Sequence, residues 1–324
     1  MVELLAPCGN LKNLICAVNS GANAVYLGLD SFSARQNADN FTFDELKYAV
    51  SYCKQFDVKV YLALNTLVKD SEMKKFFITL ETALSFGVDA IILQDVFLGK
   101  VIKEIYPNAV LHLSTQAGVC NIFGAKLAKK YGFSRVILAR ETTFEDVEEI
   151  SKIIETEIFI QGALCTAFSG HCYFSSFVGA NSGNRGLCKQ PCRKECSYYL
   201  GDKKLTKGYS LSLADLSLGS DIHKYIKAGV KSFKIEGRMR SQEYLASSIL
   251  YYKALISKND NTKYLEALKI AFNRGDYTKG LAFLQDKNFI SYKIQSNKGL
   301  FIGRIKSIFN NILLIDGSYK FSQK

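Results

Sequence analysis

The chain lacks the features of a membrane or secreted protein. No hydrophobic segment approaches the roughly 18 apolar residues that a membrane-spanning helix needs. The N-terminal residues MVELLAPCGN also lack a basic region followed by an apolar one, which a secretory signal would show. We therefore expect a soluble, cytoplasmic protein without a membrane partner. In that reducing compartment, clustered cysteines are more often metal ligands or redox groups than disulfides.

Several motifs of known chemistry are missing as well. The first turn reads APCGN, without the G-x-G-x-x-G of a dinucleotide-binding open sheet. The chain has no H-E-x-x-H and no G-x-S-x-G, so it offers no recognisable protease apparatus. It also has none of the close C-x2-C pairs that are typical of zinc sites.

Acidic residues are scarce relative to basic ones. Thirty Asp and Glu stand against 42 Lys and Arg, which gives a net charge of +12. Such a field attracts polyanions, and nucleic acid is the obvious candidate. An equally good interpretation is that lysines merely solvate helix faces, as Lys203, Lys204 and Lys207 could. The basic residues interspersed among cysteines differ, and we predict that they hold phosphates: Arg185, Lys189 and Arg193.

Short apolar runs alternate with helical patterns at the spacing of repeated βα units. Eight such units over about 250 residues favour an α/β fold, a (β/α)8 TIM-like barrel, although an open sheet is the alternative. We predict a catalytic barrel over 1–257, a helical connector over 258–287 and a small β module over 288–324. The predicted barrel strands are 3–7, 24–29, 58–64, 90–94, 110–114, 135–139, 157–161 and 232–237.

Five of the nine cysteines fall within the glycine-rich loop 162–196, which follows the seventh predicted strand. They are separated by six, fifteen, three and three residues, a looser spacing than zinc sites show and one that favours a [4Fe–4S] cluster. The last three nearly imitate the C-x3-C-x2-C signature of radical-adenosylmethionine enzymes, but their final spacing is one residue too long. We predict Cys165, Cys172, Cys188 and Cys192 as ligands and Cys196 as the spare.

Polar residues interrupt the apolar pattern where the predicted strands end, and in such barrels function collects at that face. Singly, Asn65 or Thr115 is more often a turn or cap residue. Glu236 with Lys234 or Arg238 is equally well explained as an ion pair closing the barrel. As a group, however, these residues predict a site. We expect Asp95, Glu141 and Glu236 to move protons, Asn65 and Gln116 to bind substrate, and Arg140, Lys234 and Arg238 to bind carboxylates of a small co-substrate.

The segment EIFIQGALCTAFSGHCYFS, residues 157–175, closely resembles the signature of the U32 peptidase-like, or collagenase-like, family. Further matching segments are ELLAPCGN, NAVYLGL, LALNT, LHLSTQ, ILARE, NRGLCKQPCR and FKIEGRMRS. The resemblance implies oxygen-independent hydroxylation of tRNA wobble uridine, of a ribosomal RNA cytidine or, in a divergent pair, of ubiquinone precursors. It also implies a [4Fe–4S] cluster on the four predicted cysteines and, for the RNA branches, prephenate as the hydroxyl source.

Within that family, the SLSLADL segment looks more like the ribosomal RNA branch than the tRNA branch, whose motif usually reads N-S-K-D-L. The leading hypothesis is therefore an iron–sulfur enzyme that hydroxylates an unstacked RNA base. Two alternatives stay open: a peptidase acting on collagen-like chains, and a non-catalytic RNA-binding assembly factor. The sequence leaves the oligomeric state open. It also leaves open a β module that is incomplete at Lys324, because that module resembles the start of an extension in longer family members.

Overall fold

The protein is described by a computed structural model that covers residues 2–36, 39–283, 289–310 and 312–317. Eight parallel strands pair in the order β1-β2-β3-β4-β5-β6-β7-β11, and β11 pairs again with β1, so the sheet closes. This confirms the predicted (β/α)8 barrel. The strands are β1 (Glu3–Pro7), β2 (Ala24–Leu27), β3 (Lys59–Leu64), β4 (Ala90–Leu93), β5 (Leu111–Leu113), β6 (Arg135–Ile137), β7 (Glu155–Ala163) and β11 (Ser232–Ile235).

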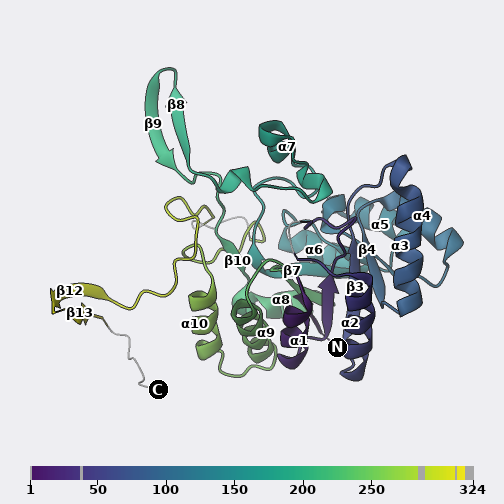
Figure 1. Cartoon of the computed structure of the whole chain (residues 1–324), viewed down its shortest axis with the longest axis horizontal. Coiled ribbons are helices and arrows are strands. Elements are labelled where there is room, and N and C mark those ends of the chain that lie inside the picture. The colour runs from purple at the N-terminus through teal and green to yellow at the C-terminus, as the bar shows by residue number, and fades with distance from the viewer. Residues whose placement is uncertain (1, 37–38, 284–288, 311, 318–324) are drawn as a thin grey trace.

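All the helices except α7 lie around the outside of this barrel, and α7 lies apart from them in the segment after β7 (Figure 1). Local sequence explains where they begin: Thr42 and Glu45 form a reciprocal capping box at the start of α2, and Asn10 caps α1. No helix in the described part of the chain is long and apolar enough to cross a membrane. The helices are α1 (Leu11–Asn19), α2 (Phe43–Gln55), α3 (Met73–Phe86), α4 (Val96–Ile105), α5 (Ile122–Lys130), α6 (Phe144–Ser151), α7 (Phe174–Gly179), α8 (Ile222–Lys227), α9 (Gln242–Ile256) and α10 (Thr262–Ala271).

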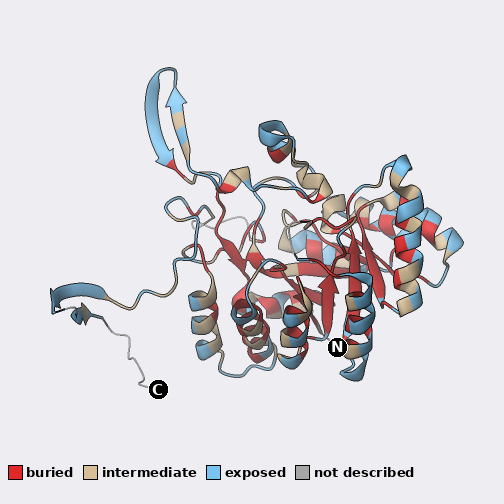
Figure 2. Cartoon of the chain, viewed as in Figure 1, coloured by how far each residue is buried: buried red, intermediate tan, exposed pale blue. Residues whose placement is uncertain are grey.

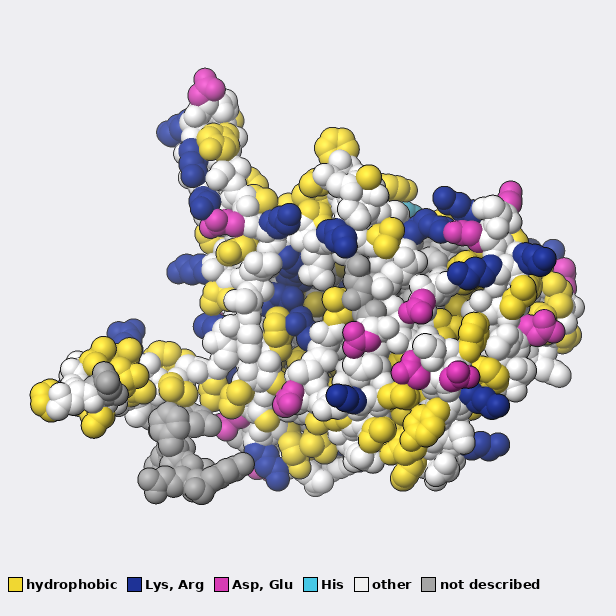
Figure 3. Space-filling model, viewed as in Figure 1, with side chains coloured by type: hydrophobic (Ala, Val, Ile, Leu, Met, Phe, Trp, Pro, Cys, Tyr) yellow, Lys and Arg dark blue, Asp and Glu magenta, His cyan; other side chains and the backbone are white. Residues whose placement is uncertain are grey.

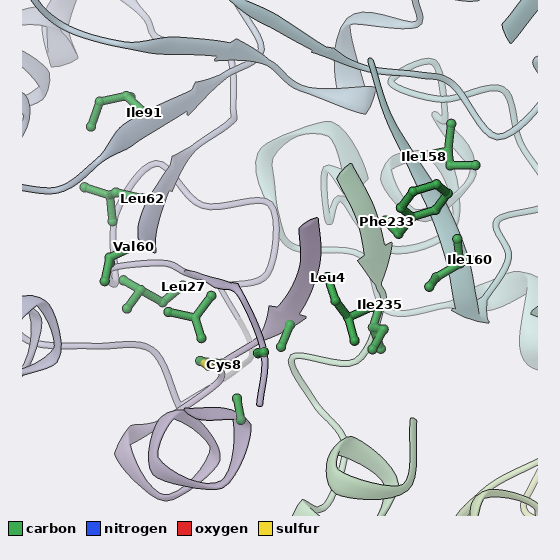
Figure 4. Packing of buried hydrophobic residues seen from close by; sticks show 14 of the residues in the cluster. Leu4, Cys8, Leu27, Val60, Leu62, Ile91, Ile158, Ile160, Phe233 and Ile235 are labelled. Carbon is green, nitrogen blue, oxygen red and sulfur yellow. The ribbon is translucent and has the colours of Figure 1, made fainter. Parts of the chain in front are cut away.

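The main core lies between the strands and the surrounding helices. Side chains alternate along each strand, so Leu4 packs in this outer layer whereas its neighbour Leu5 belongs to a smaller cluster inside the barrel. Figure 4 shows strand residues of the outer layer, with Val60 next to Leu27 and Phe233 next to Ile158. The strands are buried almost throughout (Figure 2), as expected for a parallel sheet that is covered on both faces.

Three elements were not foreseen from the sequence. Strand β10 (Asp215–Ser217) pairs antiparallel with the end of β7 and adds a ninth strand to the sheet. Strands β8 (Cys196–Leu200) and β9 (Lys203–Gly208) form a hairpin that projects from the body of the molecule (Figure 1). The sequence placed this region at the end of a loop, because its exposed residues show no clear alternation of apolar and polar side chains.

The predicted β module contains a second hairpin, which pairs β12 (Arg304–Phe309) with β13 (Ile312–Asp316). Helix α10 lies within the predicted connector. The connector prediction extends over residues 284–287, and the module prediction over residues 288, 311 and 318–324, which lie outside the described residues. The two boundaries between the three predicted domains remain predictions.

Candidate active site

A cavity of about 490 Å³ opens at the carboxyl ends of the barrel strands. Its floor and walls come from strand ends, and the cysteine-rich loop covers one side. Most of the predicted site residues meet here. Those that line the cavity are Asn65, Gln116, Arg140, Cys165, Cys172, Cys188, Cys192, Arg193, Lys234, Glu236 and Arg238.

Two glycines let the cysteine-rich loop pack closely onto the barrel mouth. A Cβ on Gly170 would lie 1.8 Å from the carbonyl oxygen of Gln116, and one on Gly186 would lie 2.3 Å from that of Ser33. Both glycines also have positive φ angles, of 78° and 85°, which other residues rarely adopt. Glycine at these positions therefore allows the loop to close against the ends of β2 and β5.

Four of the five clustered cysteines line the cavity: Cys165, Cys172, Cys188 and Cys192. Burial raises the pKa of the Cys192 thiol; Arg193 opposes this, whereas the other three cavity cysteines add to it, so each of them lies within electrostatic reach of Cys192. Cys196 does not line the cavity, and its sulfur faces the carbonyl oxygen of Lys194 at 3.6 Å. Four soft sulfur donors on one wall fit the ligand set of an iron–sulfur cluster. In the described part of the chain, however, no three His, Cys, Asp or Glu side chains lie together in a group that could hold a metal ion.

Glu236 lies at the end of β11 and is held as an ionised carboxylate. It pairs with Arg35 at 3.0 Å and accepts a hydrogen bond from the Tyr26 hydroxyl at 3.2 Å. Burial favours the neutral acid, but the charges of Arg35 and Arg140 and the two hydrogen bonds outweigh it and lower the pKa of Glu236 to about 2. A carboxylate with that pKa is a poor proton donor and a weak base at neutral pH. We therefore expect it to act as a fixed negative charge, and its predicted part in proton transfer stays a prediction.

Arg140 follows β6 and extends over the floor of the cavity. Its guanidinium stacks on the Phe159 ring at 4.4 Å from the centroid. Among the described residues, the guanidinium of Arg140 has no hydrogen-bond or ion-pair partner. All five of its N–H donors are therefore available to a ligand. Of the predicted carboxylate-binding residues, Arg140 is the best placed to bind one.

The other two predicted carboxylate-binding residues are already engaged. Lys234 is buried, pairs with Glu157 at 2.8 Å and sits over the Tyr26 ring at 4.2 Å. Arg238 is also buried and donates hydrogen bonds to the Ser33 hydroxyl at 2.6 Å and to the Asn40 side chain, although its Nε has no partner among the described residues. These side chains shape the positive floor rather than offer free donors.

The two predicted amide residues organise the loops around the cavity. Asn65 accepts a hydrogen bond from the Ala34 backbone at 3.0 Å and donates one to Ser114 at 3.3 Å, so it ties the loop after β2 to the end of β5. The carbonyl oxygen of Gln116 accepts a hydrogen bond from Gln94 at 3.3 Å. Gln116 lines the cavity, and its side-chain amide has no hydrogen-bond partner among the described residues.

Two predicted catalytic carboxylates lie outside the cavity. Asp95 caps α4, accepting hydrogen bonds from the backbone of Phe97 and Leu98 at 3.0 Å each. Glu141 accepts two hydrogen bonds from Ser169, at 2.7 Å from its backbone and 3.0 Å from its hydroxyl, and so anchors the cysteine-rich loop. Both carboxylates hold structure, and their positions do not support the predicted catalytic roles.

The predicted phosphate-binding residues also have internal partners. Arg185 pairs with Glu72 and donates to the Leu67 carbonyl, fastening the loop to the segment after β3. Arg193 is buried and donates to the Ser212 hydroxyl and to the carbonyls of Leu164 and Leu213. Three of its five N–H donors are used in this way, so Arg193 fastens the loop internally, and its predicted phosphate contact stays a prediction. Lys189 is exposed but does not line the cavity.

Sequence reasoning missed several cavity residues. Arg35 stands in the SFSARQNADNF segment, where no strand end or motif marked it, yet it provides the ion-pair partner of Glu236. Arg240 stacks on the Phe272 ring at 3.4 Å, and Arg274 pairs with Asp215. Arg35 and Arg240 lie in the loops after β2 and β11, eight and five residues beyond the strand ends, and Arg274 follows α10. Phe168 also lines the cavity and is 72% exposed.

Sequence comparison identifies relatives for most of the chain. The family model described as Peptidase family U32 matches residues 9–290. The tRNA hydroxylation protein P1 of Bacillus subtilis (strain 168) is 36% identical over 264 residues, which are 78% of this chain and 63% of that protein. The 23S rRNA 5-hydroxycytidine C2501 synthase of Escherichia coli (strain K12) is 33% identical over 261 residues, covering 79% of this chain and 39% of that protein. The chain thus spans less than two thirds of either relative.

Structural comparison supports the fold. The solved structure of the U32 peptidase Mk0906 has a TM-score of 0.50 and 14% sequence identity, covering 73% of this chain and 93% of that one. At that identity the similarity concerns the barrel architecture alone.

Proposed function

This chain is a member of peptidase family U32, and we propose that it is an enzyme that hydroxylates a base of RNA without molecular oxygen. The observation that carries the proposal is one cavity that joins four cysteines to an unpartnered arginine at the mouth of a barrel. The net charge of +12 adds an attraction for polyanions. Two relatives named for tRNA and ribosomal RNA hydroxylation support the same class of reaction.

We assign Cys165, Cys172, Cys188 and Cys192 as the residues that would hold a [4Fe–4S] cluster. Such a cluster supplies electron-transfer or Lewis-acid chemistry at the cavity wall. Cys165 is exposed whereas the other three are half-buried, so one side of the wall is open to ligands. The hydrogen bond from the Gln190 backbone to the Cys188 sulfur, at 3.3 Å, orients that side chain.

Arg140 is the residue that we propose binds the carboxylate of a small co-substrate. The proposed co-substrate is prephenate, which would act as the hydroxyl donor. A guanidinium binds a carboxylate through two parallel hydrogen bonds. Stacking on Phe159 holds the guanidinium plane, so less side-chain freedom is lost when a ligand binds. The ionised Glu236 is kept neutralised by Arg35, which limits its repulsion of an anionic ligand.

The RNA base must leave its stack to enter a cavity of this size. Phe168 and Phe174 line the cavity and are 72% and 36% exposed, so they offer aromatic faces for an unstacked base. A cytidine of ribosomal RNA is the first substrate to test, because of the SLSLADL segment, and the tRNA wobble uridine is the second.

The cofactor is tested by iron, acid-labile sulfide and the visible spectrum of anaerobically prepared protein. We expect Cys165→Ala and Cys192→Ala to lose most of the iron and sulfide, whereas Cys196→Ala keeps them. Cys53→Ala, a buried thiol on α2, is the matched control for loss of a cysteine elsewhere. Stoichiometric zinc without labile sulfide would overturn the assignment.

The reaction is tested by mass spectrometry of RNA from a deletion strain. We expect one nucleotide, in ribosomal RNA or tRNA, to lose a one-oxygen mass increment, and we expect the wild-type gene but not the Cys192→Ala gene to restore it. An unchanged modification profile contradicts the proposal. Cleavage of a collagen-like peptide by the anaerobic protein, with no RNA present, would instead favour a peptidase.

A further inference from the structure

The β8–β9 hairpin is the most prominent projection beside the mouth of the barrel. It rises from the end of the molecule that also carries α7, away from the helices around the barrel (Figure 1). All of its described residues except Cys196, Tyr198 and Gly208 are exposed. We propose that this hairpin is an arm that binds the ribose-phosphate backbone of RNA beside the base that enters the cavity. This inference rests on the proposed function and deepens it.

The hairpin is attached directly to the cavity wall. It begins at Cys196, four positions after Cys192, which lines the cavity. Its base is held by Tyr292, whose hydroxyl donates to the Lys207 carbonyl at 2.9 Å and whose own carbonyl accepts from the Tyr209 backbone at 2.9 Å. The strands beyond this base have no hydrogen bond to the rest of the described chain apart from that between Thr206 and Tyr292. The arm therefore extends from a fixed root next to the site.

Its charge fits a polyanion. The hairpin contains three lysines, Lys203, Lys204 and Lys207, and one acidic residue, Asp202. Lys207 pairs with Glu195 at 2.7 Å, but Lys203 and Lys204 have no ion-pair partner among the described residues. Figure 3 shows dark blue side chains along this arm and others over the adjoining surface. A positive surface without internal counter-ions attracts phosphate groups.

Its cross-strand pairs add a second feature. Lys204 lies opposite Tyr199, which is 60% exposed, and Lys203 lies opposite Leu200, which is 73% exposed. An aromatic ring beside an ammonium group can contact a base or ribose while the charge contacts the neighbouring phosphate. This two-stranded hairpin has few contacts with the rest of the described chain, and its exposed side chains add little to its stability. Their exposure is therefore better explained by a bound partner.

RNA fits this arm better than a protein partner does. A protein interface centred on apolar residues would not favour two unpaired lysines at its centre, because charged residues are depleted there. An anionic ligand already enters the reaction in the proposed function, and its backbone must pass the cavity mouth. The hairpin would therefore bind the part of the RNA that stays outside the cavity.

The test compares two double charge reversals. Lys203→Glu/Lys204→Glu alters the arm, and Lys74→Glu/Lys75→Glu makes the same charge change on the exposed face of α3. Binding of bulk tRNA and of a ribosomal RNA fragment is measured over a range of salt. Losing two phosphate contacts lowers the slope of log affinity against log salt by roughly 1.4 to 1.8, and the affinity near 0.15 M salt falls by about tenfold or more. We expect this for the hairpin variant and a much smaller change for the α3 variant.

A third variant tests the aromatic contact without changing charge. Loss of a stacking ring weakens binding by roughly five- to a hundredfold, so we expect Tyr199→Ala to bind RNA less well with an unaltered salt slope. Melting curves and iron content, equal to those of the wild type, show that the variants are intact.

The outcomes separate the two proposals. If wild-type protein binds neither RNA, the proposed function and the arm both fail. If it binds but the hairpin variants match the wild type, or if the α3 variant loses as much affinity, only the arm fails. Cross-linking of Tyr199 to a protein partner in place of RNA would also overturn it.

Discussion

The two ends of the barrel interior differ in how their charged side chains are paired. At the amino ends of the strands, Arg135 contacts Glu3 at 2.6 Å, Glu155 at 2.5 Å and Glu157 at 3.0 Å, and Lys234 also pairs with Glu157. Burial raises the pKa of Glu157, but Lys234 and Arg135 outweigh it, so the net shift is downward and the carboxylate stays ionised. Charges at this end therefore neutralise one another within the protein.

At the carboxyl ends the balance is positive. Seven cationic side chains but only one carboxylate, Glu236, are found among the described residues that line the cavity, and two of the seven, Lys234 and Arg274, pair with carboxylates outside it, Glu157 and Asp215. Arg35 takes that carboxylate, and Arg140 and Arg240 have no ion-pair partner in the described part of the chain. Buried or half-buried cations without counter-ions are costly unless a ligand supplies the negative charge. The paired charges at the amino ends therefore stabilise the fold, whereas the unpaired cations at the carboxyl ends are suited to bind a negatively charged ligand.

We expect the largest change in the free energy of unfolding when the ion pairs at the amino ends of the strands are removed. Arg135→Met removes the guanidinium that contacts Glu3, Glu155 and Glu157, although Lys234 still pairs with Glu157. Removing one partner from a buried charge network destabilises by about 3–5 kcal/mol. Urea unfolding measures the loss. Arg140→Met at the other end removes an arginine without an internal ion pair, and we expect it to change the free energy of unfolding by less than about 0.5 kcal/mol. Equal losses for the two variants would show that the ends do not differ.

A second experiment uses acid to test the single pair at the mouth. The folded-state pKa of Glu236, about 2, lies below its ordinary value of 4.5. The pair therefore contributes stability above about pH 5, and this contribution is lost as the pH falls towards 2. We expect the loss to be about 2–3 kcal/mol in the wild type and to be absent in Glu236→Gln. Glu104→Gln, an exposed acid on α4, is the control and should keep the wild-type acid dependence.

The sequence predicted the barrel well because its signal is repeated. Each of the eight apolar runs coincides with a strand, with ends that differ by at most two residues, since parallel strands covered on both faces need continuous apolar side chains. The four cavity cysteines were also found, because clustered thiols are rare in any other context. That they bind a cluster remains a prediction.

Individual roles were harder to predict because a polar residue after a strand has two uses. In a βα unit the strand end lies close to the start of the next helix, so Asp95 could face the cavity or cap α4, and it caps α4. The apolar residues after Asp95 were a capping signal that could have been recognised. Arg35 and Arg240 were missed for the opposite reason: their importance depends on Glu236 and Phe272, which are distant in the sequence.

A third prediction concerns the unpaired guanidinium at the mouth. Arg140→Gln removes a charged hydrogen-bonding group, which is worth about 1.5–3 kcal/mol, and we expect prephenate to bind roughly ten- to a hundredfold more weakly. Calorimetric titration of the anaerobic protein measures this. Arg140→Lys keeps the charge but cannot form two parallel hydrogen bonds to a carboxylate. Its affinity for prephenate should therefore lie between that of the wild type and that of Arg140→Gln. Unchanged binding in Arg140→Gln would place the co-substrate elsewhere.

The smallest effect tests whether Asp95 serves structure alone. Asp95→Ala removes the cap of α4, and we expect it to cost about 1 kcal/mol of unfolding free energy, whereas Asp95→Asn should cost less because Asn also caps helices well. Thr143→Ala removes the corresponding cap of α6 and is the matched control. Hydroxylation per folded molecule should be the same in all three variants. If activity falls in both Asp95 variants but not in Thr143→Ala, the carboxylate has a chemical role that its capping hydrogen bonds do not explain. Asp95 would then belong with the charges that bind a ligand and not only with those that stabilise the fold.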